Sequence, residues 1–252
     1  MNVVIITALG VGGATVIGAL IGFCFKNISE KWNDAILGFA AGIMLAAAII
    51  GLILPSVEAA GKKGIWMTVL GIFAGALFLN LADRLTPHLH SLTGMDKEVH
   101  KNNASLDKVM LFVMAIAIHN LPEGLAAGIG FGSGDIGNAM TVAIGIALQN
   151  IPEGMVTISP MLMSGVSKPR ALLIASFTGF IEVVGTFIGF FAAGISQAIL
   201  PFALAFAGGT MLYIISDEMI PDTHSHGHER IATYALLIGV VMMILMDTFI
   251  SF

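Results

Sequence analysis

Two short polar motifs stand inside long apolar runs of the chain and are suited to binding a cation. The first is HNLPEG at residues 119–124, and the second is QNIPEG at residues 149–154. Each motif lies near the middle of a run long enough to cross a bilayer. Ionisable and amide side chains are costly at that depth and are typical of functional sites. The motifs therefore predict a metal-ion site inside a membrane.

Helical spacing places the polar residues of each motif on a shared face, since residues three or four apart are neighbours on a helix. The Glu of each motif then lies beside an Asn and beside a His or Gln, and can bridge two adjacent ions. Two facing helices of this design predict a binuclear site with carboxylate, amide and imidazole ligands. The residues concerned are His119, Asn120, Glu123, Gln149, Asn150 and Glu153.

A proline in each motif is expected to interrupt its helix. Pro122 and Pro152 have no N–H, and each ring crowds the carbonyl four residues earlier, which belongs to Ile118 or Leu148. An unbonded carbonyl in lipid is unfavourable unless it lines a cavity or meets a partner. We therefore expect two broken helices whose free carbonyls add to a cation-binding surface.

Glu182 supplies a third carboxylate near the middle of a later apolar run. A single such Glu can also be a protonated, hydrogen-bonded packing residue. Two motifs at matching depth together with Glu182 favour a shared cation instead. The ligand set holds no thiolate, which favours Zn²⁺, Fe²⁺, Mn²⁺ or Co²⁺ over Cu⁺.

The composition indicates a membrane protein. The 252 residues are 57% apolar and 11% charged, whereas soluble domains average about 25% charged residues. There is no basic patch with interleaved aromatic residues, so a nucleic-acid partner is not expected. Cys24 is the single cysteine and excludes an intrachain disulfide.

The apolar runs predict an all-α, polytopic membrane protein with eight transmembrane helices in a single domain, residues 1–252. No basic segment precedes the first run, which we expect to be a retained span. The third and seventh runs are short. The runs are Val3–Phe25, Ala35–Val57, Ile65–Ala82, Val109–Phe131, Ala139–Met163, Ala171–Ala193, Phe202–Met219 and Ile231–Phe252.

The basic residues predict the orientation of the chain in the cell membrane. With eight spans, nine of the 11 Lys and Arg residues fall on one side, and only Lys62 and Lys63 fall on the other. Positive charge favours the cytoplasmic side, so both termini are expected to be extracytoplasmic. The nine residues are Lys26, Lys31, Arg84, Lys97, Lys101, Lys108, Lys168, Arg170 and Arg230.

Two of the predicted cytoplasmic loops are rich in histidine. Residues 84–108 hold three histidines, and residues 224–228 read HSHGH. Short His-rich tracts can bind metal, although a solvated polar loop explains them equally well.

The chain resembles the ZIP (Zrt/Irt-like) family of divalent metal transporters, in particular its bacterial, GufA-like branch. The resemblance covers nearly the whole chain, and the paired PEG motifs in adjacent spans are highly specific. The matching segments are DAILGFAAGIMLAA at 34–47, LTPHLH at 85–90, HNLPEGLAAGIGF at 119–131, QNIPEG at 149–154, FIEVVG at 180–185 and ISDEMIPDTH at 215–224.

The resemblance implies a ZIP-type bundle with inverted repeats that works as a homodimer by an elevator-type movement. The moving transport part would comprise residues 1–25 and 109–193, and the scaffold part residues 35–82 and 202–252. No resident cofactor is implied, because the divalent metal is the transported substrate.

The resemblance also implies roles for individual residues. The first metal site would use His119, Glu123, Gln149 and Glu153, with Met44 as a soft extra ligand. The second site would use Asn120, Glu123, Asn150, Glu153 and Glu182. Glu58 would lie near the outer entrance, and the cytoplasmic exit would use Asp83, His88, His90, Asp217, Glu218 and His228.

Three positions depart from the family pattern. Many members carry His at the position of Gln149, some close relatives carry Asp at Asn150, and one carries His at Asp217. Gln149 weakens nitrogen ligation, and Asn150 leaves the second site with one negative charge fewer.

Together these features predict uptake of a divalent metal into the cytoplasm, with Zn²⁺ as the first candidate and Fe²⁺, Mn²⁺, Co²⁺ or Cd²⁺ as others. Two alternatives remain open. An intramembrane metallohydrolase would need a zinc held by several His or Cys residues, and only His119 lies at mid-membrane. A proton or sodium carrier could use the same carboxylates.

Overall fold

The computed structural model describes residues 1–25, 28–85, 104–163, 165–196 and 198–250, and every regular element in these ranges is helical. The side chains of residues 83–85, 104–116, 163 and 250 are not described. The elements are α1 Asn2–Gly22, α2 Glu30–Ala46, the π-helical segment η1 Ala47–Ile53, α3 Leu54–Leu85, α4 Ala104–Gly132, α5 Ile136–Met163, α6 Lys168–Ile195, α7 Leu200–Ile214, the π-helical segment η3 Ile215–Met219, α8 Ile220–Thr223 and α9 Glu229–Ile250.

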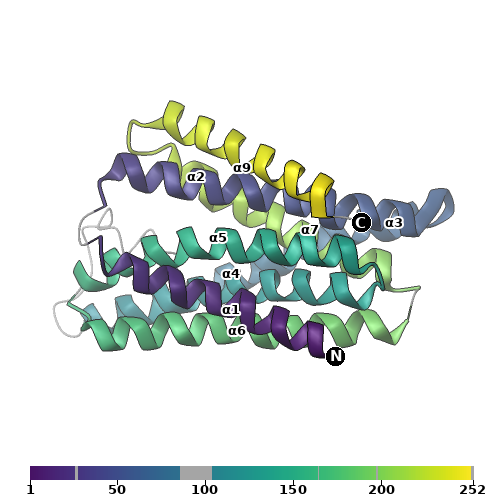
Figure 1. Cartoon of the computed structure of the whole chain (residues 1–252), viewed down its shortest axis with the longest axis horizontal. Helices are drawn as coiled ribbons and strands as arrows, with labels where there is room; N and C mark the ends of the chain where they lie inside the picture. The colour runs from purple at the N-terminus through teal and green to yellow at the C-terminus, as the bar shows by residue number, and fades with distance from the viewer. Residues whose placement is uncertain (26–27, 86–103, 164, 197, 251–252) are drawn as a thin grey trace.

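The helices lie roughly side by side in one elongated bundle, and α1 begins at the same end at which α9 finishes (Figure 1). Five helical segments among the described residues are long and apolar enough to cross a membrane, so the expected all-α membrane protein is confirmed. The polar motifs lie in α4 and α5, which are not among these five. The five are Asn2–Gly22, Glu30–Ala82, Lys168–Ile195, Leu200–Thr223 and Glu229–Phe249.

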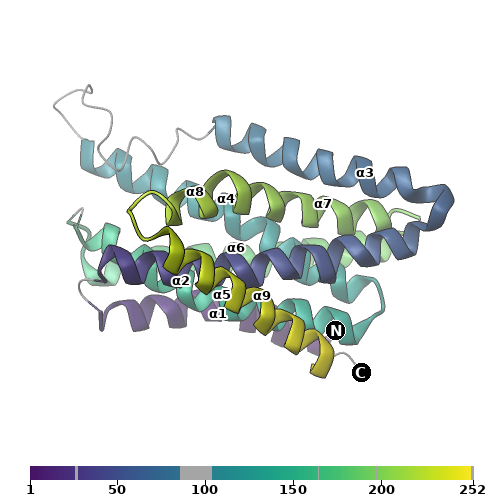
Figure 2. The same cartoon turned by 90° about the horizontal axis from the view of Figure 1, so that it is seen from above.

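The chain reverses its direction at Gly61. This residue has φ 59° and ψ −177° inside the otherwise helical stretch Leu54–Leu85. A positive φ is readily adopted only by glycine. The remainder of α3 then runs back along the bundle beside α7 (Figure 2). The structure thus separates the predicted runs 35–57 and 65–82.

The two spans that the sequence predicted to be short are longer in the structure. The third continues through Ala82 to Leu85, and the seventh continues through η3 and α8 to Thr223. The predicted loop 84–108 is shorter at both ends, because Arg84 belongs to α3 and α4 begins at Ala104. Helices extend beyond their apolar cores because polar residues at the membrane surface can continue the helical hydrogen bonding.

Glycines let the backbones around the polar motifs approach closely. A Cβ atom on Gly124 of α4 would lie less than 3 Å from the backbone of Glu182 in α6. A Cβ atom on Gly154 of α5 would meet the carbonyl oxygen of Thr15 in α1. Small residues of this kind bring membrane helices near enough for short polar side chains to bond across the interface.

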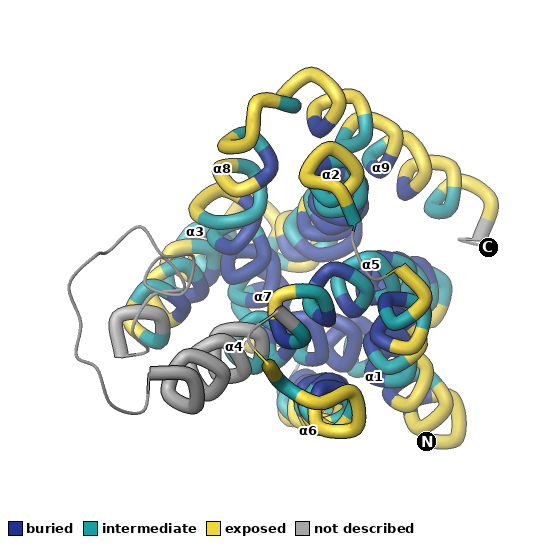
Figure 3. Tube along the Cα trace, turned by 90° about the vertical axis from the view of Figure 1, so that its left-hand side faces the viewer, coloured by how far each residue is buried: buried dark blue, intermediate teal, exposed yellow. Residues whose placement is uncertain are grey.

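Burial follows the expectation for a protein surrounded by lipid. The interior holds large apolar side chains such as Leu52, Ile146 and Met211, each fully buried. Large apolar side chains also point outward, including Phe73, which is 72% exposed. Figure 3 shows the buried residues gathered where the helices meet, with much of α9 exposed. Outward-facing apolar side chains in such numbers suit a hydrocarbon environment.

Candidate metal-ion site

The polar motifs lie on continuous helices. The helix of α4 runs through Pro122, and that of α5 runs through Pro152, so the helices are not broken at the prolines. The free carbonyls of Ile118 and Leu148 stay a prediction. Packing against neighbouring helices holds the segments helical despite the missing N–H groups. The departures from regular α-helix occur instead in η1 and η3, which the sequence did not predict.

Glu182 lies at the centre of a buried hydrogen-bond cluster. Its Oε1 accepts hydrogen bonds from Asn120 Nδ2 at 2.5 Å and from Thr15 Oγ1 at 2.6 Å. Its Oε2 accepts one from Asn150 Nδ2 at 2.5 Å, and the same amide also lies 3.3 Å from the carbonyl oxygen of Val11. The side chains come from α1, α4, α5 and α6, and Glu182 is fully buried.

A second contact joins the two motifs directly. Gln149 Nε2 of α5 donates to Glu123 Oε1 of α4 at 2.6 Å, and both residues are 1% exposed. Glu123 also interacts electrostatically with Glu153 and Glu182. The structure therefore brings the three membrane-depth carboxylates into one region.

His119 connects this region to η3. Its Nε2 lies 3.0 Å from Glu218 Oε1, with the His side chain 15% and the Glu side chain 30% exposed. Glu153, which is half-buried, interacts electrostatically with both of these residues. The three residues form the more exposed side of the cluster. A π-helical turn such as η3 is frequent at functional sites.

Four buried oxygens of the motifs accept no hydrogen bond. They are Asn120 Oδ1, Glu123 Oε2, Gln149 Oε1 and Asn150 Oδ1. A buried polar atom without a partner costs free energy. Among the described residues, the remaining buried side-chain atom of this kind is Asp34 Oδ2. Cations bound to these oxygens would supply the missing partners, so the residues fit a metal-ion site.

Carboxylates and imidazoles alone do not complete such a site. In the ranges that the structure describes, no three His, Cys, Asp or Glu side chains converge closely enough to hold one ion by themselves. The unpaired amide oxygens of the motifs are the further candidates for ligands.

The other predicted ligands lie outside this cluster or outside the described part of the chain. Met44 of α2 is 1% exposed and belongs to the apolar core, so its role as a ligand stays a prediction. Glu58 and Asp217 are exposed, and His228 is half-buried in the loop after α8. Asp83 lies in α3, although its side chain is not described, and His88 and His90 lie outside the described residues.

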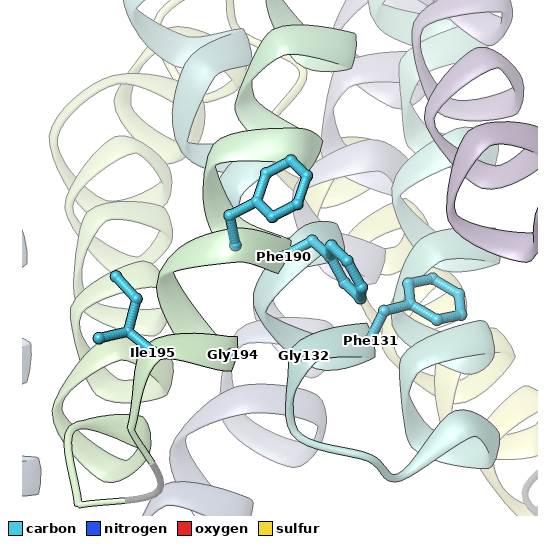
Figure 4. Close-up of a pocket in the computed structure, with 6 residues that line it drawn as sticks. Phe131, Gly132, Phe190, Gly194 and Ile195 are labelled. Atoms are coloured by element: carbon cyan, nitrogen blue, oxygen red, sulfur yellow. The ribbon is translucent and has the colours of Figure 1, made fainter. Parts of the chain in front are cut away.

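The two surface hollows that the structure shows most clearly lie away from the cluster. One, of about 300 Å³, is lined by aromatic and small residues at the ends of α4 and α6, including Phe131, Phe190 and Ile195 (Figure 4). Phe131 and Phe190 are each eight residues from the nearest buried Glu, or about 12 Å along a helix. The second hollow is lined by Glu58, Gly61 and Lys62.

Sequence reasoning missed Thr15. It is one of two threonines in the apolar run of α1, the other being Thr7, and no motif marks it. A polar residue that recurs at the depth of the other polar residues is the one signal that could have identified it.

Comparison with known proteins identifies the family of the chain. Residues 93–247 match the model of a family described as ZIP Zinc transporter. The chain belongs to the ZIP family. "Zinc transporter GufA" of Myxococcus xanthus is 38% identical, with 98% of each chain covered. "Zinc transporter ZIPB" of Bordetella bronchiseptica is 37% identical over 93% of this chain and 77% of the relative. "Zinc transporter ZupT" of Chlorobaculum parvum is 35% identical over 92% of this chain and 91% of the relative.

Membership of the ZIP family confirms the resemblance drawn from the PEG motifs. The family consists of transporters and not of enzymes, so the metallohydrolase alternative is wrong. Family membership also places the chain among multi-pass membrane proteins, in agreement with the helical bundle.

Proposed function

We propose that this chain transports a divalent transition-metal ion, with Zn²⁺ as its main substrate, into the cytoplasm through the polar cluster of α4, α5 and α6. The names of its relatives support zinc as the substrate. Oxygen and imidazole ligands suit Zn²⁺ and also Fe²⁺, Mn²⁺, Co²⁺ and Cd²⁺.

The observation that carries the proposal is the set of four unpaired buried oxygens. The first ion would be held by Glu123 and Gln149, through the oxygens that lack donors. His119 and Glu153 would join them by a movement of their side chains, because no three described His and Glu side chains converge on one point in this structure. The existing amide-to-carboxylate bonds position those oxygens without using them. A cation would therefore add interactions and need not displace the bond between Gln149 and Glu123.

The second ion would use the oxygens around Glu182. Asn120 Oδ1 and Asn150 Oδ1 both lack donors, and Glu182 Oε2 accepts one hydrogen bond. A carboxylate has about four acceptor positions, so Oε2 retains one for an ion. With Asn150 in place of an acid, this site is less negative and should fill after the first.

An elevator-type movement is supported by the way the helices pack. α1 packs against α5 and α6, and α4 packs against α6, whereas α2 packs against α9 and α3 against α7. We assign these groups to the transport part, 1–25 and 109–193, and the scaffold part, 35–82 and 202–252. Contacts of α5 with α2 and of α4 with α7 form the boundary between the two parts. The bond between His119 and Glu218 crosses from one group to the other.

The ion would enter near Glu58 and leave near Glu218. Glu58 lies exposed beside the reversal at Gly61, at the end of the bundle that carries Lys62 and Lys63. An entering ion must exchange its bound water for protein ligands, and these ligands must later release the ion. Glu218 would accept the ion from His119 when the transport part moves, before the exit-side residues Asp217 and His228.

Zinc uptake by reconstituted vesicles tests this proposal. Vesicles that contain the wild-type protein and an internal zinc indicator should accumulate Zn²⁺, whereas Glu123→Ala vesicles should behave like empty ones. Glu30→Gln, which changes an exposed carboxylate at the start of α2, serves as the control and should retain uptake. Undiminished uptake by Glu123→Ala would remove the central cluster from the mechanism. Sodium or proton flux without metal flux would favour the carrier alternative.

A further inference from the structure

Thr15 is a buried polar residue of α1 to which neither motif assigns a role. It is 4% exposed, and its Oγ1 donates to Glu182 Oε1 at 2.6 Å. Thr15 therefore touches the centre of the cluster from a helix that supplies none of the predicted ligands.

The backbone of α1 is fixed close to the helices that carry the cluster. Gly12 lies against Gly179 of α6, where a Cβ atom on either residue would meet the carbonyl oxygen of the other. The carbonyl oxygen of Thr15 lies against Gly154 of α5. A β-branched side chain in a helix also has few χ1 options. The hydroxyl of Thr15 is thus held in one place relative to Glu182.

The hydrogen bonds of Glu182 determine how the two asparagine amides are turned. Both amides direct their NH₂ groups at this carboxylate, and both Oδ1 atoms are left without donors. Turning either amide over would place its oxygen against a carboxylate oxygen, which is unfavourable. Glu182 therefore keeps Asn120 Oδ1 and Asn150 Oδ1 available, provided that its own carboxylate stays in place.

We propose that Thr15 is a positioning residue of the metal-ion site: it fixes the carboxylate of Glu182, which in turn keeps the oxygens of Asn120 and Asn150 directed toward the ion. The inference rests on the proposed function. Thr15 is not itself a ligand of the ion. It acts by holding Glu182 in the position in which this carboxylate accepts hydrogen bonds from Asn120 and Asn150.

The test compares three threonine variants. Thr15→Val keeps the shape and removes the hydroxyl, Thr15→Ser keeps the hydroxyl, and Thr178→Val is the control. Thr178 is 1% exposed on α6, one turn before Glu182, but its hydroxyl donates to the carbonyl oxygen of Ala175. The measurements are the KM and maximal rate of Zn²⁺ uptake by vesicles and calorimetric titration of the purified protein with Zn²⁺.

We expect Thr15→Val to raise the KM and weaken Zn²⁺ binding about 10-fold, since one buried hydrogen bond to Glu182 is lost. Thr15→Ser should stay within about 2-fold of the wild type, and Thr178→Val should bind as the wild type does. Wild-type affinity in Thr15→Val, or equal loss in Thr15→Ser and Thr15→Val, would overturn the inference.

Two further readouts separate the possible failures. If Thr15→Val does not elute as folded protein in size-exclusion chromatography, Thr15→Ala replaces it in the same comparison with the same expected loss. If the wild type itself neither binds nor transports Zn²⁺, the proposed function fails. If the wild type does both and the Thr15 variants match it, only the positioning role fails.

Discussion

Gln149 is the residue at which this site differs most from a histidine-rich zinc site. It offers an amide oxygen, and its NH₂ group is already bonded to Glu123. An imidazole nitrogen is a softer ligand that suits Zn²⁺ better than Mn²⁺. The choice of ligand at this position should therefore affect selectivity among metals.

Gln149→His is expected to tighten Zn²⁺ binding by about 10-fold and to change Mn²⁺ binding less, because nitrogen replaces oxygen as a ligand. Competition titrations of the purified variant with the two metals measure the ratio. Gln149→Leu, which removes the ligand, is the control and should weaken both metals. An equal gain for both metals in Gln149→His would argue against ligation at this position.

Glu153→Gln should lower the number of Zn²⁺ ions bound per chain, because Glu153 is one of the two carboxylates, with Glu123, that both predicted sites share. We expect uptake to fall to a few per cent of the wild-type rate, as the loss of an ionic ligand costs roughly 2–3 kcal/mol. Metal content after equilibrium dialysis gives the count. An unchanged count with lost proton flux would support a proton carrier instead.

At the scale of the element, the local sequence predicted which polar residues of each motif share one face of its helix. The spacing within each PEG motif placed its polar residues on one face, and the structure joins Gln149 to Glu123 and Asn120 to Glu182. The contribution of Thr15 and the contact of His119 with Glu218 depend on helices far apart in the sequence, so no local pattern could predict them. The π-helical segments likewise depend on packing, which can override helix propensity.

Close packing of α1 on α6 gives a prediction about stability. Gly12→Ala would force a Cβ atom against the carbonyl oxygen of Gly179, whereas the nearby Gly10 has open space around it. We expect Gly12→Ala to lower the stability by about 1–3 kcal/mol. Retention of the folded protein after heating in detergent measures the change.

Gly10→Ala, two residues away on the same helix, is the matched control. It should be neutral or slightly stabilising, because alanine favours the helix by up to about 1 kcal/mol relative to glycine. Equal losses in both variants would show that the approach of α1 to α6 does not depend on Gly12.

At the scale of the whole molecule, the charge distribution predicts which end of the bundle faces the cytoplasm. Cys24 is exposed at the end of α1, on the side proposed to be cytoplasmic. A membrane-impermeant maleimide should therefore label it in inverted vesicles and leave it unlabelled in intact cells. Lys62→Cys in a Cys24→Ser background should show the opposite pattern. Labelling of Cys24 from outside would reverse the proposed orientation.

The position of a bound metal ion tests the central claim most directly. Anomalous diffraction from crystals grown with Zn²⁺ should show a peak between α4 and α5, about 2.0–2.2 Å from an oxygen of Glu123, and no such peak in Glu123→Ala crystals. Zinc bound only in the surface loops, with the Glu123 and Gln149 side chains free of metal, would contradict the account.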